Sequence, residues 1–300
     1  MTTSSSIYTT EAAPVAVVSS DSEWRRALRY LRKDIKVVVG CIVLCLLLLT
    51  ALLAPILTPY DPNAQEFDLL LPPSGKHLLG TDEFGRDLLS RLIAGARVSL
   101  LVGFAAVSLA VLASVPLGLL AGYYGGWIDT VIMRYIDLQW AFPSLIIAVG
   151  LMAILGPGVG NVIIAVSLAY IDDFARLARG EVLSLREEEF IVASRATGCS
   201  DFRIIVHHLL PNSLSPLIVQ ATVSISYAIL AESTLSFLGL GVEITTPTWG
   251  LILSGARGFF TMAWWLAIFP GLAIMVTVLS INFVGDGLRD ALDVKVSHAE

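Results

Sequence analysis

Long apolar runs alternate with short polar segments along most of this 300-residue chain. A helix needs about 20 apolar residues to cross the roughly 30 Å hydrocarbon core of a bilayer. Six runs qualify, at residues 37–57, 98–123, 135–155, 162–177, 214–238 and 264–284. The pattern therefore predicts an all-α polytopic membrane protein with six transmembrane helices.

The basic residues are distributed unevenly between the two sides of this arrangement. With the N-terminus inside, 14 of the 19 Lys and Arg residues fall in cytoplasmic segments, and the outside keeps only Lys76, Arg86, Arg91, Arg97 and Arg257. Because cytoplasmic loops carry the excess of Lys and Arg in membrane proteins, we expect both termini to be cytoplasmic.

The segments outside the spans have distinct patterns. Residues 1–22 are rich in Ser and Thr and predict a disordered tail, and residues 291–300 predict a second tail. Residues 23–36 predict an amphipathic interfacial helix, and the alternative is that they extend the first span (37–57) as its polar end. The external segment 58–97 is expected to contain a second amphipathic helix over 82–94. Residues 98–290 would then form a five-helix core that includes a cytoplasmic loop, 178–212.

Composition supports a membrane protein and offers no metal or disulfide chemistry. The chain is 56% hydrophobic and 15% charged, with a mean hydropathy of +0.78, whereas soluble domains carry about 25% charge. Cys41 and Cys45 lie in an apolar run and are predicted to be small buried residues, Cys199 is isolated, and the four His residues have no metal-ligand spacing. Gly75-Lys76 lacks the rest of a nucleotide-binding P-loop, so we expect no ATP to bind through such a loop.

The most informative segment is polar and runs from Arg176 to Asn212. A first helix is predicted from Glu187 to Ala196, ended by Gly198, because glycine accepts the left-handed conformation of a helix C-cap. Ser200 or Asp201 would cap a second helix, which Pro211 and Asn212 would end before the fifth span. The pattern predicts a helix–Gly–helix elbow, and an ordinary loop with incidental helicity is equally compatible with the spacing alone.

This segment resembles the signature loop of the inner-membrane permeases of ATP-binding cassette (ABC) importers. That motif reads Glu-Ala-Ala, three residues, Gly, and later Ile, His, Leu and Pro. Here Val192-Ala193-Ser194 stands at the first position, and the later matches are Gly198, Ile204, His208, Leu210 and Pro211. Val192 and Ser194 depart from the pattern, and Glu189 is expected to supply the missing carboxylate.

Three further stretches resemble the dipeptide/oligopeptide/nickel branch of these permeases. They are residues 77–100, which begin His-Leu-Leu-Gly-Thr-Asp-Glu-Phe-Gly-Arg-Asp; residues 235–250, with Leu-Ser-Phe-Leu-Gly-Leu-Gly and Pro-Thr-Trp-Gly; and residues 285–293. The resemblance covers about residues 24–295 and implies the type I ABC importer permease fold.

The resemblance also implies a function, partners and a site. The chain would be a non-enzymatic permease subunit in a prokaryotic cytoplasmic membrane, carrying di- or oligopeptides, or alternatively nickel, glutathione or opines. Its partners would be a second homologous permease, two ATPase subunits that bind ATP and Mg, an external binding protein and membrane lipid, with no nucleic acid and no cofactor of its own. The elbow would contact the ATPase through Glu189, Ala193, Ser194, Arg195, Gly198, Ile204, His208 and Pro211, with Arg179 as a further candidate.

Acidic residues within the predicted spans are costly and usually face protein or water. Glu232, Asp172 and Asp173 are therefore candidates for the translocation path or for contact with the second permease, and an interfacial hydrogen bond is the alternative for Glu232. Asp137 is expected to pair with Arg134. An ion-coupled secondary transporter is a rival function, but it leaves the elbow motif unexplained. An intramembrane enzyme would need a nucleophile–base pair or metal ligands within the spans, and the sequence offers none, whereas a structural anchor for cytosolic partners stays open.

Overall fold

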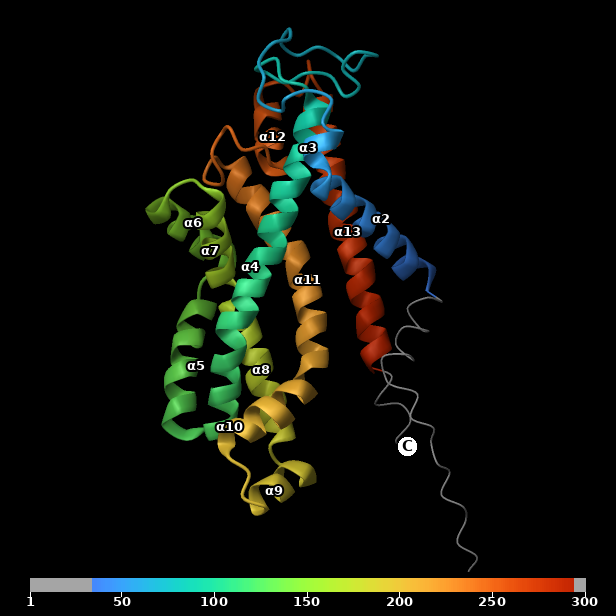
Figure 1. The fold of residues 1–300 in the computed structure, drawn as a ribbon. Helices are drawn as coiled ribbons and strands as arrows, with labels where there is room; N and C mark the ends of the chain where they lie inside the picture. Colours follow the sequence, from blue (N-terminus) through green and yellow to red (C-terminus); the bar gives the residue numbers. More distant parts are fainter. Residues whose placement is uncertain (1–33, 294–300) are drawn as a thin grey trace, which may run out of the picture.

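A computed structural model describes residues 34–293 of the chain, and these residues form a bundle of helices (Figure 1). One isolated bridge, between Thr81 and Asp87, is the only β pairing within them. The helices are α2 (Ile35–Leu52), α3 (Ala54–Leu57), α4 (Leu88–Tyr124), α5 (Gly126–Trp140), α6 (Ser144–Leu155), α7 (Val159–Ala169), α8 (Ile171–Leu185), α9 (Glu189–Ala196), α10 (Asp201–Ile204), a π-helical turn η1 (Ile205–Leu209), α11 (Leu210–Phe237), α12 (Trp249–Gly255), a 3-10 turn η2 (Ala256–Gly258) and α13 (Trp265–Asp293).

Within the described residues, four helices are long and apolar enough to cross a membrane. They are α2, α4, the continuous helix Asp201–Phe237 and α13. The predicted third span, 135–155, is not one helix, because α5 and α6 meet at 89°. The bend falls at Ala141–Pro143, where a proline disfavours helical geometry in the residue before it. Counting this pair as one span gives five, so the six-span count stays a prediction.

The predicted fourth span, 162–177, is also divided. The apolar helix α7 has only 11 residues, and Tyr170 leaves helical geometry with φ −116° and ψ 9°. The following helix, α8, carries Asp172, Asp173, Arg176 and Arg179 on one polar face. The predicted fourth span was therefore wrong as one continuous helix, because it combined the apolar helix α7 with the apolar face of the amphipathic helix α8.

Several predicted boundaries were wrong. No separate helix covers 82–94. Asp87 is instead the N-cap of α4, with its carboxylate accepting a hydrogen bond from the Ser90 N–H, and α4 runs for 37 residues from Leu88. The predicted sixth span, 264–284, lies, apart from its first residue, within α13, which continues past Gly285 and Gly287 to Asp293. Cys41 and Cys45 are exposed on α2 rather than buried. The predicted tail 1–22 and most of the interfacial segment 23–36 lie outside the described residues.

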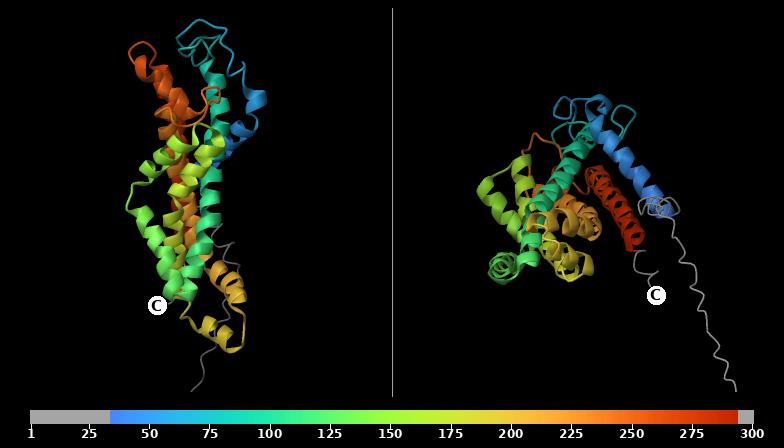
Figure 2. Two further views of the ribbon diagram at one scale, coloured as in Figure 1. Left: turned by 90° about the vertical axis from the view of Figure 1, so that its left-hand side faces the viewer. Right: turned by 60° about the horizontal axis from the view of Figure 1, so that its bottom comes forward.

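Helix α4 occupies the centre of the bundle and packs against α8, α7 and α11 (Figure 1). Its contact with α8 is close because glycines face it: a Cβ on Gly122 would lie 2.8 Å from Val182, and one on Gly118 would meet the Ala175 carbonyl. Small residues spaced four apart let helix backbones approach in this way. On the other side of the molecule, α13 packs against α2 and α11 (Figure 2).

The two ends of the bundle carry the irregular segments (Figure 2). At one end, residues 58–87 form a cap beside α12, and at the other end α9 and α10 project beyond α4 and α8.

Buried charged and polar groups hold the cap together. The Nε atom of Arg86 lies 2.6 Å from an Asp82 oxygen, His77 Nδ1 lies 3.0 Å from Asp87, and the Trp265 indole donates to the Thr81 carbonyl at 3.1 Å.

Candidate coupling site

The elbow consists of two short arms that meet at Gly198. The first arm is α9, which ends at Ala196, and Gly198 adopts φ +80°, where a side chain would be strained. The Gly198 N–H donates to the Arg195 carbonyl at 3.0 Å and the Cys199 N–H donates to the Ser194 carbonyl at 3.1 Å. These bonds satisfy carbonyls that the end of a helix leaves free. The structure therefore contains the helix–Gly–helix shape that the sequence predicted.

The second arm differs from the prediction because it does not end at Pro211. Helix α10 passes through the π-helical turn η1 into α11, so that residues from Asp201 to Phe237 form one helix. Proline has no N–H to donate within a helix and its ring crowds the preceding turn. The wider π turn lies directly before Pro211 and accommodates it, with the Leu210 N–H donating to the Ile205 carbonyl. The elbow is therefore joined rigidly to a membrane-spanning helix.

The inner side of the elbow belongs to the main hydrophobic core. Ile191 on α9, Ile204 on α10 and Leu209 on η1 are each fully buried. They share a cluster with Leu119 of α4 and Val182 of α8. Both arms therefore pack into the same hydrophobic core as α4, α8 and α11.

Tyr123 at the end of α4 fastens the two arms to each other. Its hydroxyl donates to Asp201 Oδ1 at 2.7 Å, and the Arg195 guanidinium lies over its ring at 5.1 Å from the centroid. A cation above an aromatic face is attracted by the ring quadrupole. Arg195, predicted as a contact to the ATPase, is thus engaged within the chain in this structure.

The outer side of the elbow is exposed and combines apolar and acidic groups. Phe202 is 74% exposed and Val192 51% exposed, and Phe190 is also exposed. Glu187, Glu188 and Glu189 are exposed beside them. Exposed apolar side chains rimmed by charge are typical of a protein-interaction surface. The arrangement can offer a docking surface, and the described residues hold no cluster of metal-ligating side chains anywhere.

The remaining predicted contact residues fall on both sides of the elbow. Ala193 and Pro211 are exposed, Ser194 donates back to the Phe190 carbonyl at 2.7 Å, and His208 is partly exposed, with its carbonyl accepting from Asn212. Which of these side chains touch an ATPase stays a prediction.

Two ion pairs tie α5 to α8 above the elbow. Arg179 makes a bidentate pair with Asp129, at 2.5 and 2.6 Å, and Arg176 pairs with Asp137 at 2.7 Å. The expected pairing of Asp137 with Arg134 was wrong, because α8 brings Arg176 to Asp137 instead. Arg176 also lies over the Trp140 ring, at 4.4 Å from its centroid.

The acidic candidates in the spans lie in two different places. Glu232 is fully buried within the chain and accepts hydrogen bonds from Ser99 of α4 at 3.1 Å and from Ser236 at 2.8 Å. It therefore joins α11 to α4 near the start of α12. Asp172 is buried and accepts from Gln139, whereas Asp173 is exposed, and both line a cavity of about 390 Å³ beside the α5–α6 bend. Their predicted roles in the path or at a permease contact remain predictions.

Sequence reasoning missed the residues that position the elbow. Tyr123 and Asp129 gave no local signal, because their partners Asp201 and Arg179 lie 78 and 50 residues away. A signal did exist for the α4–α8 contact, namely the Gly-Leu-Leu-Ala-Gly sequence at 118–122, whose small-xxx-small spacing marks close helix packing in membranes.

Two family models match most of the chain. Residues 114–298 match the binding-protein-dependent transport system inner membrane component family, and residues 22–73 match the N-terminal transmembrane domain of oligopeptide transport permease C.

Similar curated proteins include two permeases named for small peptides. The dipeptide transport system permease DppC of Alkalihalophilus pseudofirmus is 48% identical, over 92% of this chain and 91% of that protein. The di/tripeptide permease DppC of Pseudomonas aeruginosa is 48% identical, over 81% and 82%. The glutathione permease GsiD of Pectobacterium atrosepticum is 44% identical, over 91% and 90%.

A solved structure shares the fold. A chain of the inward-facing MetNI methionine ABC transporter superposes with a TM-score of 0.57 at 20% identity, over 68% of this chain and 97% of that one. The chain thus belongs to the binding-protein-dependent transport system inner membrane components, the permeases of ABC importers, and is a multi-pass protein of a prokaryotic cytoplasmic membrane.

Proposed function

We propose that this chain carries di- or oligopeptides inward and is driven by separate ATPase subunits that grip its elbow. The observation that supports this most is the construction of the elbow. Its outer face is exposed and apolar, its inner face is buried in the core, and its second arm continues without a break into α11. Such a segment can receive force from a partner and pass it to the spans.

The small-peptide class is supported by the names of similar proteins, among them dipeptide and di/tripeptide permeases. Glutathione is itself a tripeptide, and the likeness to glutathione permeases makes it the second candidate substrate. Nickel and opines are the other substrates expected from the resemblance.

The proposed assembly contains a second homologous permease, two ATPase subunits and an external binding protein. In it the chain has six spans and cytoplasmic termini, with the elbow inside and the cap outside. ATP and Mg would be held by the ATPases, and this chain would hold no cofactor. ATPase closure would move the elbow as a rigid body and switch the permeases between two states, since such assemblies change by rotation of packed elements rather than by continuous deformation.

The experiment compares two glycines with the same local geometry. Gly198 and Gly239 both have φ +80°, and each N–H donates to a carbonyl three residues earlier at 3.0 Å, but Gly239 lies at the far end of α11. Proline at either position loses that bond and cannot adopt the backbone angle. We expect Gly198→Pro to abolish peptide uptake and ATPase co-purification while the chain still inserts.

The readouts are peptide uptake in membrane vesicles at matched subunit levels and the amount of ATPase that co-purifies. Gly239→Pro should retain the ATPase. Normal uptake by Gly198→Pro would rule out the elbow as the coupling element, and absence of any co-purifying ATPase from the unaltered chain would rule out the function itself.

A further inference from the structure

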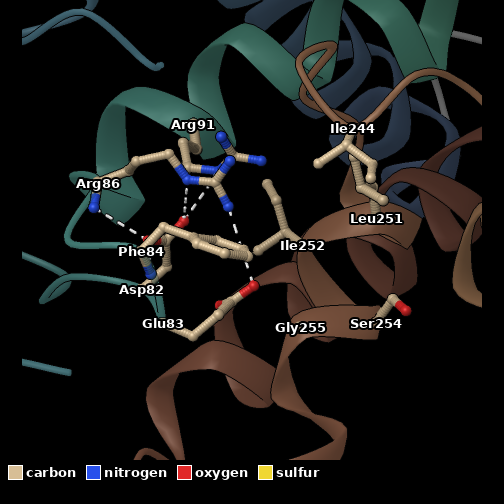
Figure 3. Close-up of a pocket in the computed structure, with 10 residues that line it drawn as sticks. All are labelled: Asp82, Glu83, Phe84, Arg86, Arg91, Ile244, Leu251, Ile252, Ser254 and Gly255. Atoms are coloured by element: carbon tan, nitrogen blue, oxygen red, sulfur yellow. Dashed lines mark hydrogen bonds and ion pairs between the residues drawn. The ribbon is translucent and has the colours of Figure 1, made fainter. Parts of the chain in front are cut away.

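A cavity of about 190 Å³ lies at the end of the molecule opposite the elbow, between the cap and α12 (Figure 3). One wall is formed by charged residues of the cap and the first turn of α4, namely Asp82, Glu83, Arg86 and Arg91. The facing wall is largely apolar and comes from Ile244, Leu251 and Ile252.

The two arginines in this cavity are almost completely buried but incompletely paired. Arg86 is 5% and Arg91 1% exposed. Their Nε atoms share one carboxylate, Asp82, at 2.6 and 3.3 Å, and Arg91 Nη1 donates to the Pro62 carbonyl at 3.1 Å. Within residues 34–293, no hydrogen bond reaches the terminal nitrogens of Arg86 or Nη2 of Arg91, and both side chains line the cavity. The Arg86 guanidinium also lies over the Phe84 ring, 4.6 Å from its centroid. Buried guanidinium groups are costly unless their N–H groups find acceptors.

Asp82 cannot supply the missing acceptors, because it also receives the backbone N–H groups of Phe84 and Arg86, each at 2.9 Å. Glu83 is the other carboxylate at the site, and it lies 3.9 Å from Arg86 Nη2, beyond hydrogen-bond distance. Its carboxylate rests instead against Gly255 of α12. Burial raises the pKa of Glu83 even with two arginines nearby, which agrees with a weak pairing.

An acceptor with the chemistry of a carboxylate would complete this site. Arginine presents N–H groups in a planar fork that matches two carboxylate oxygens, and such charge-assisted pairs are stronger than neutral hydrogen bonds. At the mouth, Phe84 and Ile244 are exposed and provide apolar contact around the charge. A charged centre with an apolar rim is the usual composition of a protein-docking point.

We propose that this cavity receives an acidic side chain of the external binding protein, which takes the place that Glu83 occupies loosely beside Arg86. This rests on the proposed function, because it presumes a binding-protein partner. We choose a protein side chain over a carboxylate of the transported peptide because the cavity is lined by the cap, the first turn of α4 and the segment from Ile244 through α12, at one end of the bundle (Figure 1).

The test measures the affinity of the cognate binding protein for the assembled transporter in lipid nanodiscs. Glu83→Gln removes the competing charge and leaves the Asp82 pairs intact, so binding should tighten severalfold. Arg86→Gln removes one of the two guanidinium groups. Binding should weaken by about tenfold or more, because that is the change in affinity expected when one charge-assisted hydrogen bond is lost. Glu66→Gln, an exposed glutamate elsewhere on the cap, makes the same charge change and should have no effect.

The outcomes separate this inference from the function on which it rests. If Arg86→Gln fails to fold, Glu83→Gln still decides the question, because it does not disturb the Asp82 pairs. Unchanged affinity in Glu83→Gln, or an equal change in Glu66→Gln, would overturn the proposal while ATPase co-purification remains intact. A Glu83→Gln effect on peptide-stimulated ATPase activity in the absence of binding protein would also overturn it, since the carboxylate would then come from the peptide.

Discussion

The two ends of this molecule treat their polar residues in opposite ways. At the cap, His77, Asp82, Arg86, Asp87 and Arg91 are all nearly inaccessible and bond to one another. At the elbow, three successive glutamates and several apolar side chains are exposed. Buried charges are costly unless they are paired, so the charged groups of the cap bond mainly within the chain and only the arginine N–H groups that line the cavity are left for a partner, whereas the groups of the elbow are exposed. The cap is fastened by contacts inside the chain, and the elbow presents the exposed surface that we propose an ATPase grips.

The largest effect is expected at the centre of the cap. Asp82→Ala leaves Arg86 and Arg91 buried without their shared carboxylate, and breaking a buried ion pair costs about 3–5 kcal/mol. We expect the free energy of unfolding in detergent to fall by that amount, with poor recovery of folded protein. Asp68→Ala, at an exposed position on the same cap, is the control and should change little. Equal stability of the two variants would contradict the view that these contacts fasten the cap.

The next effect separates the two faces of the elbow. Ile191→Ala opens a cavity in the core and should lower the free energy of unfolding by about 2–5 kcal/mol. Val192→Ala, at the neighbouring exposed position, should leave stability nearly unchanged and reduce the affinity for the ATPase. Thermal unfolding and ATPase co-purification measure the two quantities. Loss of ATPase binding without loss of stability in Ile191→Ala would reverse our assignment of the faces.

A smaller effect is expected where α4 fastens the elbow. Tyr123→Phe keeps the ring beneath Arg195 but removes the hydrogen bond to Asp201, which is worth about 0.5–1.5 kcal/mol. The connection between the arms should loosen, so limited proteolysis between residues 197 and 201 should accelerate. Unchanged cleavage would show that the core contacts alone hold the arms together.

The smallest effect concerns the α5–α8 pair between Arg176 and Asp137. Both side chains are partly exposed, at 36% and 55%, and such pairs contribute about 0–1 kcal/mol. Arg176→Gln should therefore shift the unfolding temperature only slightly, and raised salt should produce a similar shift in the unaltered chain. A loss as large as that of Asp82→Ala would show that this pair belongs with the buried network.

Much of the elbow could be predicted because its determinants are local. Gly198 follows a short amphipathic run, and only glycine adopts φ +80° without strain, so the first arm and its end followed from a few adjacent residues. Pro211 misled the prediction, since a proline ordinarily ends a helix, and the π turn before it depends on the packing of Ile205 and Leu209 against the core.

Features that depend on neighbouring residues could be predicted from the sequence, whereas features that depend on distant residues required the tertiary structure. The apolar runs by themselves determined that the chain enters a membrane, and the motif residues around the elbow determined its family. Only the tertiary structure decided that 135–155 bends by 89°, that Asp137 pairs with Arg176, and that Arg86 and Arg91 share one carboxylate beside a cavity. Hydrophobic length and glycine geometry act over neighbouring residues, whereas the pairing of charges depends on which helices pack together, and no single stretch of sequence records that.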